Sequence, residues 1–268
     1  MSRDLRFGVL GGLMVSRRGS EQPISAAKHR VLLACLLTSP GAGVPVRRLV
    51  TCLWGEAPPD NARAVVHTYV SRLRALLGSP SVIETLPEGY QVRVQEHQLD
   101  LLRFRALVRR AAGEEDVGAK LDLLDKALAE WRGLPLSDVD SVALHQAEVV
   151  RLNAEWRAAA DRRAELMLRC GRHVEVLPQL QYLTSEQPLD ERLRGQLMLA
   201  LYQCGNQAAA LETYQQPWSG TRSGTEEAVQ GDPAWRTRPA RPDRPGTNHL
   251  VADLPAPRGH RRTRRAHV

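Results

Sequence analysis

The N-terminal part of the chain shows a β-type hydrophobic pattern first and a helical pattern afterwards. In residues 5–24, short β-prone pieces are interrupted by four glycines, as small strands joined by tight turns require. From Ala26 onward, apolar residues recur at helical spacing until the breaker sequence Ser39-Pro40-Gly41. A second helical piece, residues 46–54, ends at Gly55 and the paired prolines after it. The pattern therefore predicts two or three strands of a minor sheet, followed by two helices.

Residues 61–77 predict a third helix, which carries its large apolar side chains on one face. Asp60 or Asn61 can cap its N-terminus, and Gly78-Ser79-Pro80 closes it. At about 100° per residue, the large apolar residues fall within a single arc, which we expect to be buried. They are Val65, Val66, Tyr69, Val70, Leu73, Leu76 and Leu77.

The rest of this helix is basic, polar or small. No carboxylate follows Asp60 to offset its three arginines and one histidine, whereas solvated helix faces usually mix both signs of charge. A helix that enters the major groove of DNA needs donors for phosphates and base edges, and small side chains that allow close approach. The pattern predicts a recognition helix; an ordinary amphipathic helix with solvated arginines is the alternative. The candidate DNA contacts on it are Arg63, His67, Thr68, Ser71, Arg72 and Arg74.

A β-hairpin is predicted directly after this helix. Residues 82–86 and 90–94 alternate in strand fashion around Pro87-Glu88-Gly89, which forms a natural turn. Three helices followed by a hairpin is the order of a winged helix. Arg93, on the second strand, is therefore a further candidate for contact with the adjacent DNA backbone.

The chain from residue 98 to residue 216 has the pattern of stacked helical hairpins. Setting Gly171 on Gly205 gives a self-match at an offset of 34 residues. This is the period of tetratricopeptide repeats, whose paired helices bury their faces by stacking on neighbours. An earlier hairpin, residues 101–110 and 119–131, fits the same plan more weakly, and a generic helical bundle is the alternative. The predicted fold class is mainly α: a winged helix-turn-helix (α+β) followed by an α-helical tetratricopeptide-like repeat domain.

The net charge of +7 is divided unevenly along the chain. Residues 1–97 carry a net charge of +5, residues 98–216 carry −3, and residues 217–268 carry +5. This division suggests three parts with different partners. We predict a winged-helix DNA-binding domain (1–97), a helical repeat domain (98–216) and a tail (217–268). The tail is rich in arginine and proline, a composition that cannot bury a core, so we expect it to be disordered.

Other classes of protein are disfavoured by what the sequence lacks. It has no run of about 18 apolar residues and no signal-peptide pattern, so we expect a cytoplasmic protein without a membrane partner. The four cysteines lie far apart in the sequence, without zinc-site spacing, and are expected to be reduced core thiols. No His/Asp/Ser or carboxylate grouping has catalytic spacing, so we expect no enzyme, no cofactor and no metal ion.

Several ordered blocks of the sequence are similar to one known family. The blocks are Lys28-His29-Arg30-Val31-Leu32-Leu33, residues 49–55, Pro58-Pro59, residues 67–74, residues 127–136 and residues 196–202. Over about residues 5–216 the chain resembles the Streptomyces antibiotic regulatory protein (SARP) family of activators. The resemblance implies an OmpR-like winged helix that binds direct repeats in promoters, usually as a dimer. It also implies a bacterial transcriptional activation domain that recruits RNA polymerase, and control of secondary-metabolite gene clusters.

The sequence departs from the family pattern in two places. Leu86 stands where the family's hairpin usually has an arginine, and the tip carries the acidic Glu88, which implies weaker contact of the wing with DNA. After Tyr214 the family continues its last repeat, whereas this chain turns into the tail. Larger relatives add an ATPase module, for which this chain has no G-x-x-x-x-G-K-[ST] motif.

The predicted function is a sequence-specific DNA-binding activator of a secondary-metabolite (antibiotic) gene cluster, with promoter DNA and RNA polymerase as partners. The alternative is a helical-repeat protein-interaction scaffold with impaired or lost DNA binding.

Overall fold

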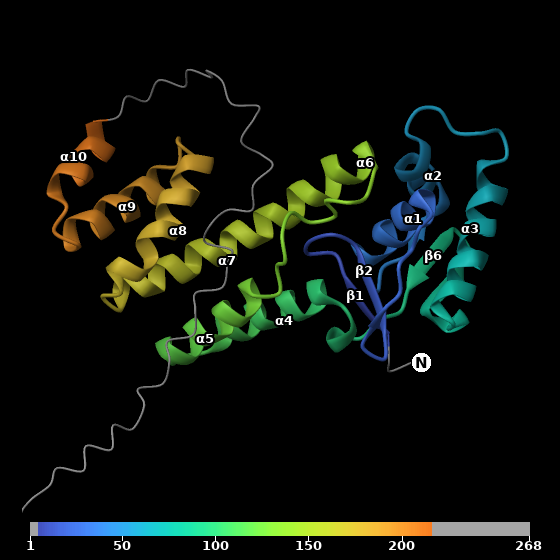
Figure 1. The fold of residues 1–268 in the computed structure, drawn as a ribbon, viewed down its shortest axis with the longest axis horizontal. Coiled ribbons are helices and arrows are strands. Elements are labelled where there is room, and N and C mark those ends of the chain that lie inside the picture. Colours follow the sequence, from blue (N-terminus) through green and yellow to red (C-terminus); the bar gives the residue numbers. More distant parts are fainter. Residues whose placement is uncertain (1–4, 216–268) are drawn as a thin grey trace, which may run out of the picture. The chain divides into compact units, whose positions relative to one another are not determined.

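The computed structural model describes residues 5–215, and a small antiparallel sheet comes first (Figure 1). Strands β1 (Leu5–Gly8), β2 (Met14–Arg17) and β3 (Ser20–Glu21) pair in that order. Leu5 and Phe7 are buried while Arg6 between them is exposed, which is the two-residue period of a half-buried strand. The strands predicted for residues 5–24 are confirmed.

Three helices and a second sheet complete the winged helix. The helices α1 (Ala27–Leu37), α2 (Val46–Trp54) and α3 (Ala62–Leu77) pack against one another. A 3₁₀ turn, η1 (Pro80–Val82), leads from α3 into a sheet with the strand order β4 (Val44–Pro45), β6 (Gly89–Val92), β5 (Ile83–Leu86). A Cβ at Gly89 would collide with the Val44 carbonyl oxygen, so only glycine lets these strands approach. The predicted helix-helix-helix-hairpin order is confirmed, and β4 adds a short third strand to the wing.

The remaining described chain is helical, which confirms the mainly α fold class. After the turn η2 (Glu96–Gln98), α4 and α5 form a hairpin, and α7 packs against both α5 and α8 (Figure 1). A π-helical turn, η3 (His145–Val149), joins the short α6 to α7. The helices are α4 (Asp100–Gly113), α5 (Val117–Leu128), α6 (Val142–Leu144), α7 (Val150–Arg169), α8 (His173–Glu186), α9 (Glu191–Gln203) and α10 (Gln207–Gln215).

The hairpins α7–α8 and α9–α10 repeat at the interval that the sequence predicts. Gly171 follows α7 and Gly205 follows α9, with φ of 74° and 80°. The amide after each glycine donates a hydrogen bond to the carbonyl five residues before it, at 2.9 Å in both turns. This is the Schellman pattern of helix termination, which favours glycine because the residue is left-handed. The 34-residue self-match therefore reflects two equivalent helical hairpins.

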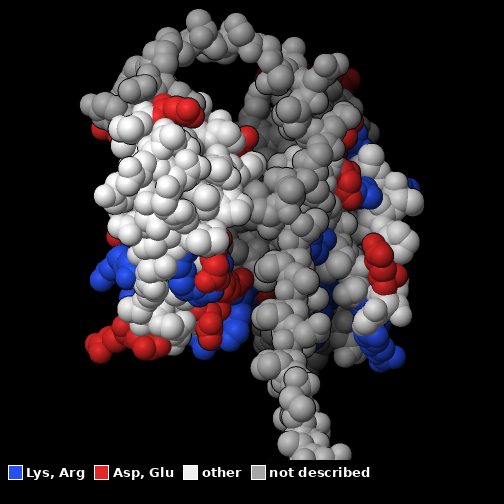
Figure 2. Space-filling model, turned by 60° about the vertical axis from the view of Figure 1, so that its left-hand side comes forward, with Lys and Arg blue, Asp and Glu red and all other residues white. Residues whose placement is uncertain are grey.

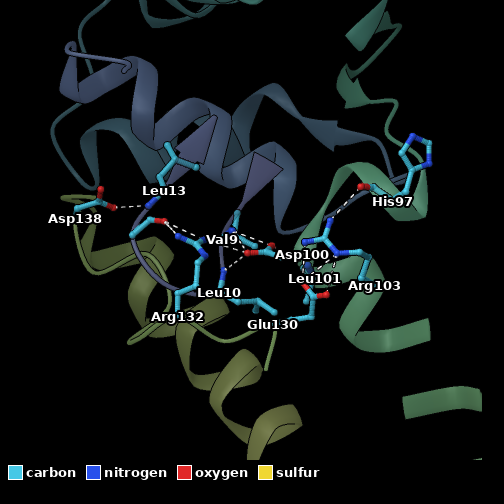
Figure 3. A network of polar contacts seen from close by, with 11 residues as sticks. Val9, Leu10, Leu13, His97, Asp100, Leu101, Arg103, Glu130, Arg132 and Asp138 are labelled. Atoms are coloured by element: carbon cyan, nitrogen blue, oxygen red, sulfur yellow. Dashed lines mark hydrogen bonds and ion pairs between the residues drawn. The ribbon is translucent and has the colours of Figure 1, made fainter. Parts of the chain in front are cut away.

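The winged helix and the helical part lie in one compact unit, joined by a seam of polar contacts (Figure 3). At its centre is Asp100, the first residue of α4, which is 2% exposed. Its carboxylate accepts hydrogen bonds from the amides of Val9 at 2.9 Å and Leu10 at 3.0 Å, and pairs with Arg132 at 3.1 Å. A buried carboxylate with this many donors fixes the loop after β1 against α4.

The seam continues along α1 and α2. The Ser141 hydroxyl donates to the Cys52 carbonyl at 2.6 Å, and the Arg48 guanidinium pairs with the buried Glu148. Arg151 of α7 donates to the Thr38 carbonyl at 3.0 Å. No local sequence pattern predicts these contacts, because their partners lie about a hundred residues apart.

Two expectations about single side chains are wrong. Leu76 was placed on the apolar arc of the third helix but is 55% exposed, because the buried stripe is narrower than the arc. Cys35 and Cys52 are buried thiols, whereas Cys170 is exposed and Cys204 half-buried. These two cysteines occupy the C-cap positions of α7 and α9, where the chain leaves the core.

The predicted disorder of the tail concerns residues that lie outside the described range. Within residues 5–215, no helix combines the length and the apolar character that crossing a bilayer requires.

Candidate nucleic-acid interface

Helix α3 buries one stripe and presents its other side to solvent. The stripe consists of Ala62, Val66, Val70, Leu73 and Leu77, whose spacing of three and four residues faces α1 and α2. Asn61 occupies the N-cap position without a capping hydrogen bond from its side chain, and Gly78 ends the helix with φ of 57°. The helix is thus fixed by packing along its whole length.

Five of the seven predicted contacts are distributed over the solvent-exposed surface of α3. Arg63, His67 and Ser71 follow one another at intervals of four residues, and Thr68 and Arg72 form a second such row. All five are exposed. We refer to these five residues as the recognition face.

Arg63 and Arg72 supply the charge of the recognition face. In the part of the chain that the structure describes, neither forms an ion pair with a carboxylate. The arginines expected on this helix were predicted to point outward without local neutralisation, and for these two the geometry agrees. Two uncompensated guanidinium groups on the exposed surface of one helix can donate hydrogen bonds to phosphates or base edges.

Arg74 and Arg93 are engaged within the protein instead. The Arg74 guanidinium donates to the Ile83 carbonyl at 2.9 and 2.7 Å, and to the Thr85 hydroxyl at 2.8 Å. Arg93 pairs with Glu84 at 2.5 Å, with 54% of its side chain exposed. Arg74 therefore joins the end of α3 to strand β5, and Arg93 lies across the outer surface of the hairpin.

Further contacts hold the wing and α3 in register. His67 Nδ1 lies 3.2 Å from the Tyr90 hydroxyl on β6, and the Thr68 hydroxyl donates to the Ala64 carbonyl at 3.1 Å. At the hairpin tip, the Val46 amide donates to the Glu88 carbonyl at 3.0 Å. The tip is thus tied to the start of α2, with the Glu88 side chain exposed.

An aromatic layer that no local sequence pattern predicts joins α3 to α1 and α2. The buried His29 of α1 packs edge-on against Tyr69 of α3, with ring centroids 4.9 Å apart, and Tyr69 stacks on Trp54 at 6.3 Å. Burial, reinforced by the positive charge of Arg72, lowers the pKa of His29. The only hint in the sequence is the position of His29 within the Lys28-His29-Arg30 block.

The helical part exposes apolar side chains near its C-terminal end. Over α8–α10, Figure 2 shows a surface with few charged side chains. Leu199 and Tyr202 of α9 are 46% and 57% exposed, and Leu211 of α10 is 60% exposed. Clustered apolar side chains on an exposed surface are typical of a site for protein contact. We refer to these three residues as the apolar face.

Comparison with known proteins relates both parts of the chain to transcription regulators. Residues 21–92 match the family "Transcriptional regulatory protein, C terminal", and residues 99–224 match the family "Bacterial transcriptional activator domain". The regulatory protein DnrI of Streptomyces peucetius is 31% identical over 223 residues, which cover 78% of this chain and 82% of DnrI. The chain belongs to the Streptomyces antibiotic regulatory protein family of transcriptional activators.

Other relatives of this SARP chain are longer. The regulatory protein AfsR of Streptomyces coelicolor is 38% identical over 247 residues, which cover 86% of this chain and 25% of AfsR. A solved structure of Mycobacterium tuberculosis EmbR in complex with a low affinity phosphopeptide superposes with a TM-score of 0.71 at 35% identity. That match covers 79% of this chain and 58% of the EmbR chain. The SARP chain therefore spans between a quarter and three fifths of these two relatives.

Proposed function

We propose that this SARP protein binds promoter DNA through the recognition face of α3 and activates a secondary-metabolite (antibiotic) gene cluster by recruiting RNA polymerase. It acts in the cytoplasm and binds direct repeats as a homodimer. The observation that carries the proposal is the exposure of Arg63 and Arg72 on opposite flanks of the solvent-exposed surface of α3, without a carboxylate partner among the described residues. Such groups attract phosphates and can bind guanine edges through two parallel hydrogen bonds.

The wing assists this contact in two ways. Arg74 holds β5 against the end of α3, so it positions the hairpin beside the groove. Arg93, more than half exposed, approaches the neighbouring phosphates once it leaves Glu84. On this proposal, Arg63, His67, Thr68, Ser71 and Arg72 contact bases or phosphates, while Arg74 acts as a positioning residue.

Footprinting on promoter fragments from the protein's own gene neighbourhood tests DNA binding. We expect protected direct repeats spaced by about one turn of DNA, which would also give the stoichiometry. The double variant Arg63→Ala/Arg72→Ala should lose the footprint, since each bidentate base contact contributes about 1–3 kcal/mol. Arg172→Ala is the matched control, because Arg172 is exposed but pairs with Glu175 on the helical part. Footprints of equal strength in all three proteins would contradict the proposal.

Recruitment of RNA polymerase is supported by the apolar face. Replacing Leu199 and Leu211 by Gln should leave the footprint unchanged and abolish activated transcription in a purified system. Because both side chains are exposed, the variant should fold as the natural chain does, and its thermal unfolding checks this. Full activation by this variant would show that polymerase is contacted elsewhere.

A second hypothesis is a protein-interaction scaffold that has lost DNA binding. It is favoured by the exposed acidic Glu88 at the wing tip and by the pairing of Arg93 with Glu84. The two hypotheses differ in mobility-shift assays on the same promoter fragments. An activator binds with an affinity that falls steeply with salt, whereas the scaffold leaves the DNA unshifted.

A further inference from the structure

The two buried cysteines of the winged helix lie next to each other. Cys35 on α1 and Cys52 on α2 are 17 positions apart in sequence, yet their sulfur atoms are 3.4 Å apart, with the Cys35 thiol donating to the Cys52 sulfur. Cys35 is fully buried and Cys52 is 8% exposed. Two thiols in van der Waals contact need only a short approach to form a bond.

The two sulfurs differ in access and in charge environment. Cys52 lines a surface groove between α2 and the α6–η3 segment, together with Arg48, Ala143, Leu144 and Glu148. A small solute in this groove reaches Cys52 before it can reach Cys35. The hydrogen bond from Cys35, and then the nearby Arg48 guanidinium, lower the pKa of Cys52 against the opposing effect of burial. The same hydrogen bond and burial raise the pKa of Cys35.

We propose that Cys52 and Cys35 form an oxidant-sensitive thiol pair that closes to a reversible disulfide on exposure to hydrogen peroxide. The Cys52 thiolate attacks one peroxide oxygen, so an S–O bond forms, the O–O bond breaks, and the leaving hydroxide takes up a proton to give water. The Cys35 sulfur then attacks the Cys52 sulfenic acid, the S–S bond forms, the S–O bond breaks, and the Cys35 proton leaves with the hydroxide as a second water. The two thiols are oxidised by two electrons, and one peroxide is reduced to two waters.

The two cysteines lie where the winged helix contacts the helical part. The Cys52 carbonyl accepts the Ser141 hydroxyl at 2.6 Å, so the pair lies at the seam between the winged helix and the helical part. The bond would link α1 to α2, the two helices on which α3 packs. The inference does not depend on the proposed DNA binding, and its test measures the thiols alone.

Peptide mapping of the oxidised chain tests the proposal. The full chain carrying Cys170→Ser and Cys204→Ser is treated with hydrogen peroxide, its remaining thiols are alkylated, and it is digested with trypsin without reductant. Cleavage after Arg30, Arg47, Arg48 and Arg63 places Cys35 in residues 31–47 and Cys52 in residues 49–63. We expect these two peptides joined in most molecules, with a mass lower by two hydrogen atoms than their sum, and released by dithiothreitol.

Single variants separate the roles of the two sulfurs. In the same background, Cys35→Ser should stop at the sulfenic acid, which dimedone labels on Cys52, whereas Cys52→Ser should leave Cys35 as a thiol. The joined peptide is measured in the chain that retains both Cys35 and Cys52. That measurement therefore remains valid if a single variant does not fold. The exposed Cys170 of the natural chain serves as the reference thiol. If peroxide oxidises Cys170 completely while Cys35 and Cys52 both remain alkylatable, or if dimedone labels Cys35 first, the proposal is wrong.

Discussion

Arginines on α3 and arginines on the helical part have different surroundings. Arg103 of α4 makes three hydrogen bonds to Glu130, at 2.6–3.0 Å, and this contact raises its pKa. Arg63 and Arg72 of α3 have no carboxylate partner among the described residues. The same side chain therefore stabilises one region and remains available for a ligand in the other. The neighbouring carboxylates decide which role applies.

Some arginines of the winged helix do form ion pairs with the helical part. Its Arg30 and Arg48 pair with Asp138 and Glu148, which both belong to the helical part. Carboxylates of the helical part thus neutralise the arginines that face the seam, while those of the recognition face stay uncompensated. The net charge of +5 on residues 1–97 and of −3 on residues 98–216 agrees with these two roles of the arginines.

The largest effect is expected where a carboxylate is removed from the seam. Asp100→Ala should lower the free energy of unfolding by about 3–5 kcal/mol, because it leaves buried amides and Arg132 without their acceptor. Urea denaturation measures the loss. Asp125→Ala is the control, since Asp125 pairs with Arg163 but is 44% exposed, and should cost at most about 1 kcal/mol. Equal losses would remove the distinction between buried and surface carboxylates.

Arg72 and Arg74 lie two positions apart on α3, but replacing them by alanine should have different effects. One substitution should change DNA binding and the other should change stability. Arg74→Ala should lower the free energy of unfolding by about 1–2 kcal/mol, because the Ile83 carbonyl loses a charged donor. Arg72→Ala should leave urea stability unchanged and weaken DNA binding, as proposed above. A loss of stability in Arg72→Ala as large as that in Arg74→Ala would mean that Arg72 also has a structural role.

The unpaired charge of Arg72 should be visible in the titration of His29. The pKa of His29 lies below its ordinary value of 6.5, from burial first and from Arg72 second. Stability supplied by neutral His29 is therefore full above pH 6.5 and is lost as the pH falls toward the lowered pKa, because the unfolded chain binds the proton more tightly.

NMR titration of the histidine ring measures this directly. Arg72→Ala should move the pKa of His29 upward, toward 6.5, and reduce the loss of stability in acid. His67→Gln is the control, because His67 is exposed and its removal should leave the titration of His29 in place. An unchanged His29 titration in Arg72→Ala would show that another group screens the Arg72 charge.

The smallest effect is expected at the wing. Glu84→Gln should change the free energy of unfolding by less than about 1 kcal/mol, since its pair with Arg93 is exposed. Freed from its carboxylate, Arg93 should strengthen DNA binding modestly and increase the salt slope by about 1 if it reaches a phosphate. Binding isotherms at several salt concentrations measure both. An unchanged slope would place Arg93 away from the DNA.

Most of the fold could be predicted from the local periodicity of the sequence. Contacts between residues that are distant in the sequence could not. The stripe of α3, the hairpin and the paired glycines at 171 and 205 depend on neighbours within a few turns of chain, so the sequence predicts them. The acceptors of Arg74 and the contact of Cys35 with Cys52 depend on how helices meet. Asp100 and Val9, 91 residues apart, share no pattern that a sequence shows. For the same reason the sequence could place the candidate contacts on α3, but could not show that Arg74 and Arg93 form contacts within the protein.

Only residues 93–95 separate the last wing strand from the turn that begins the helical part. The polar contacts between the winged helix and the helical part further restrict how far the two can move apart. On the proposed function, the contacts that join the helical part to the winged helix set the rotational phase at which the helical part projects from the bound DNA. We therefore expect a five-base-pair insertion between operator and core promoter to abolish activation, and a ten-base-pair insertion to restore part of it, since B-DNA turns once in about 10–10.5 base pairs.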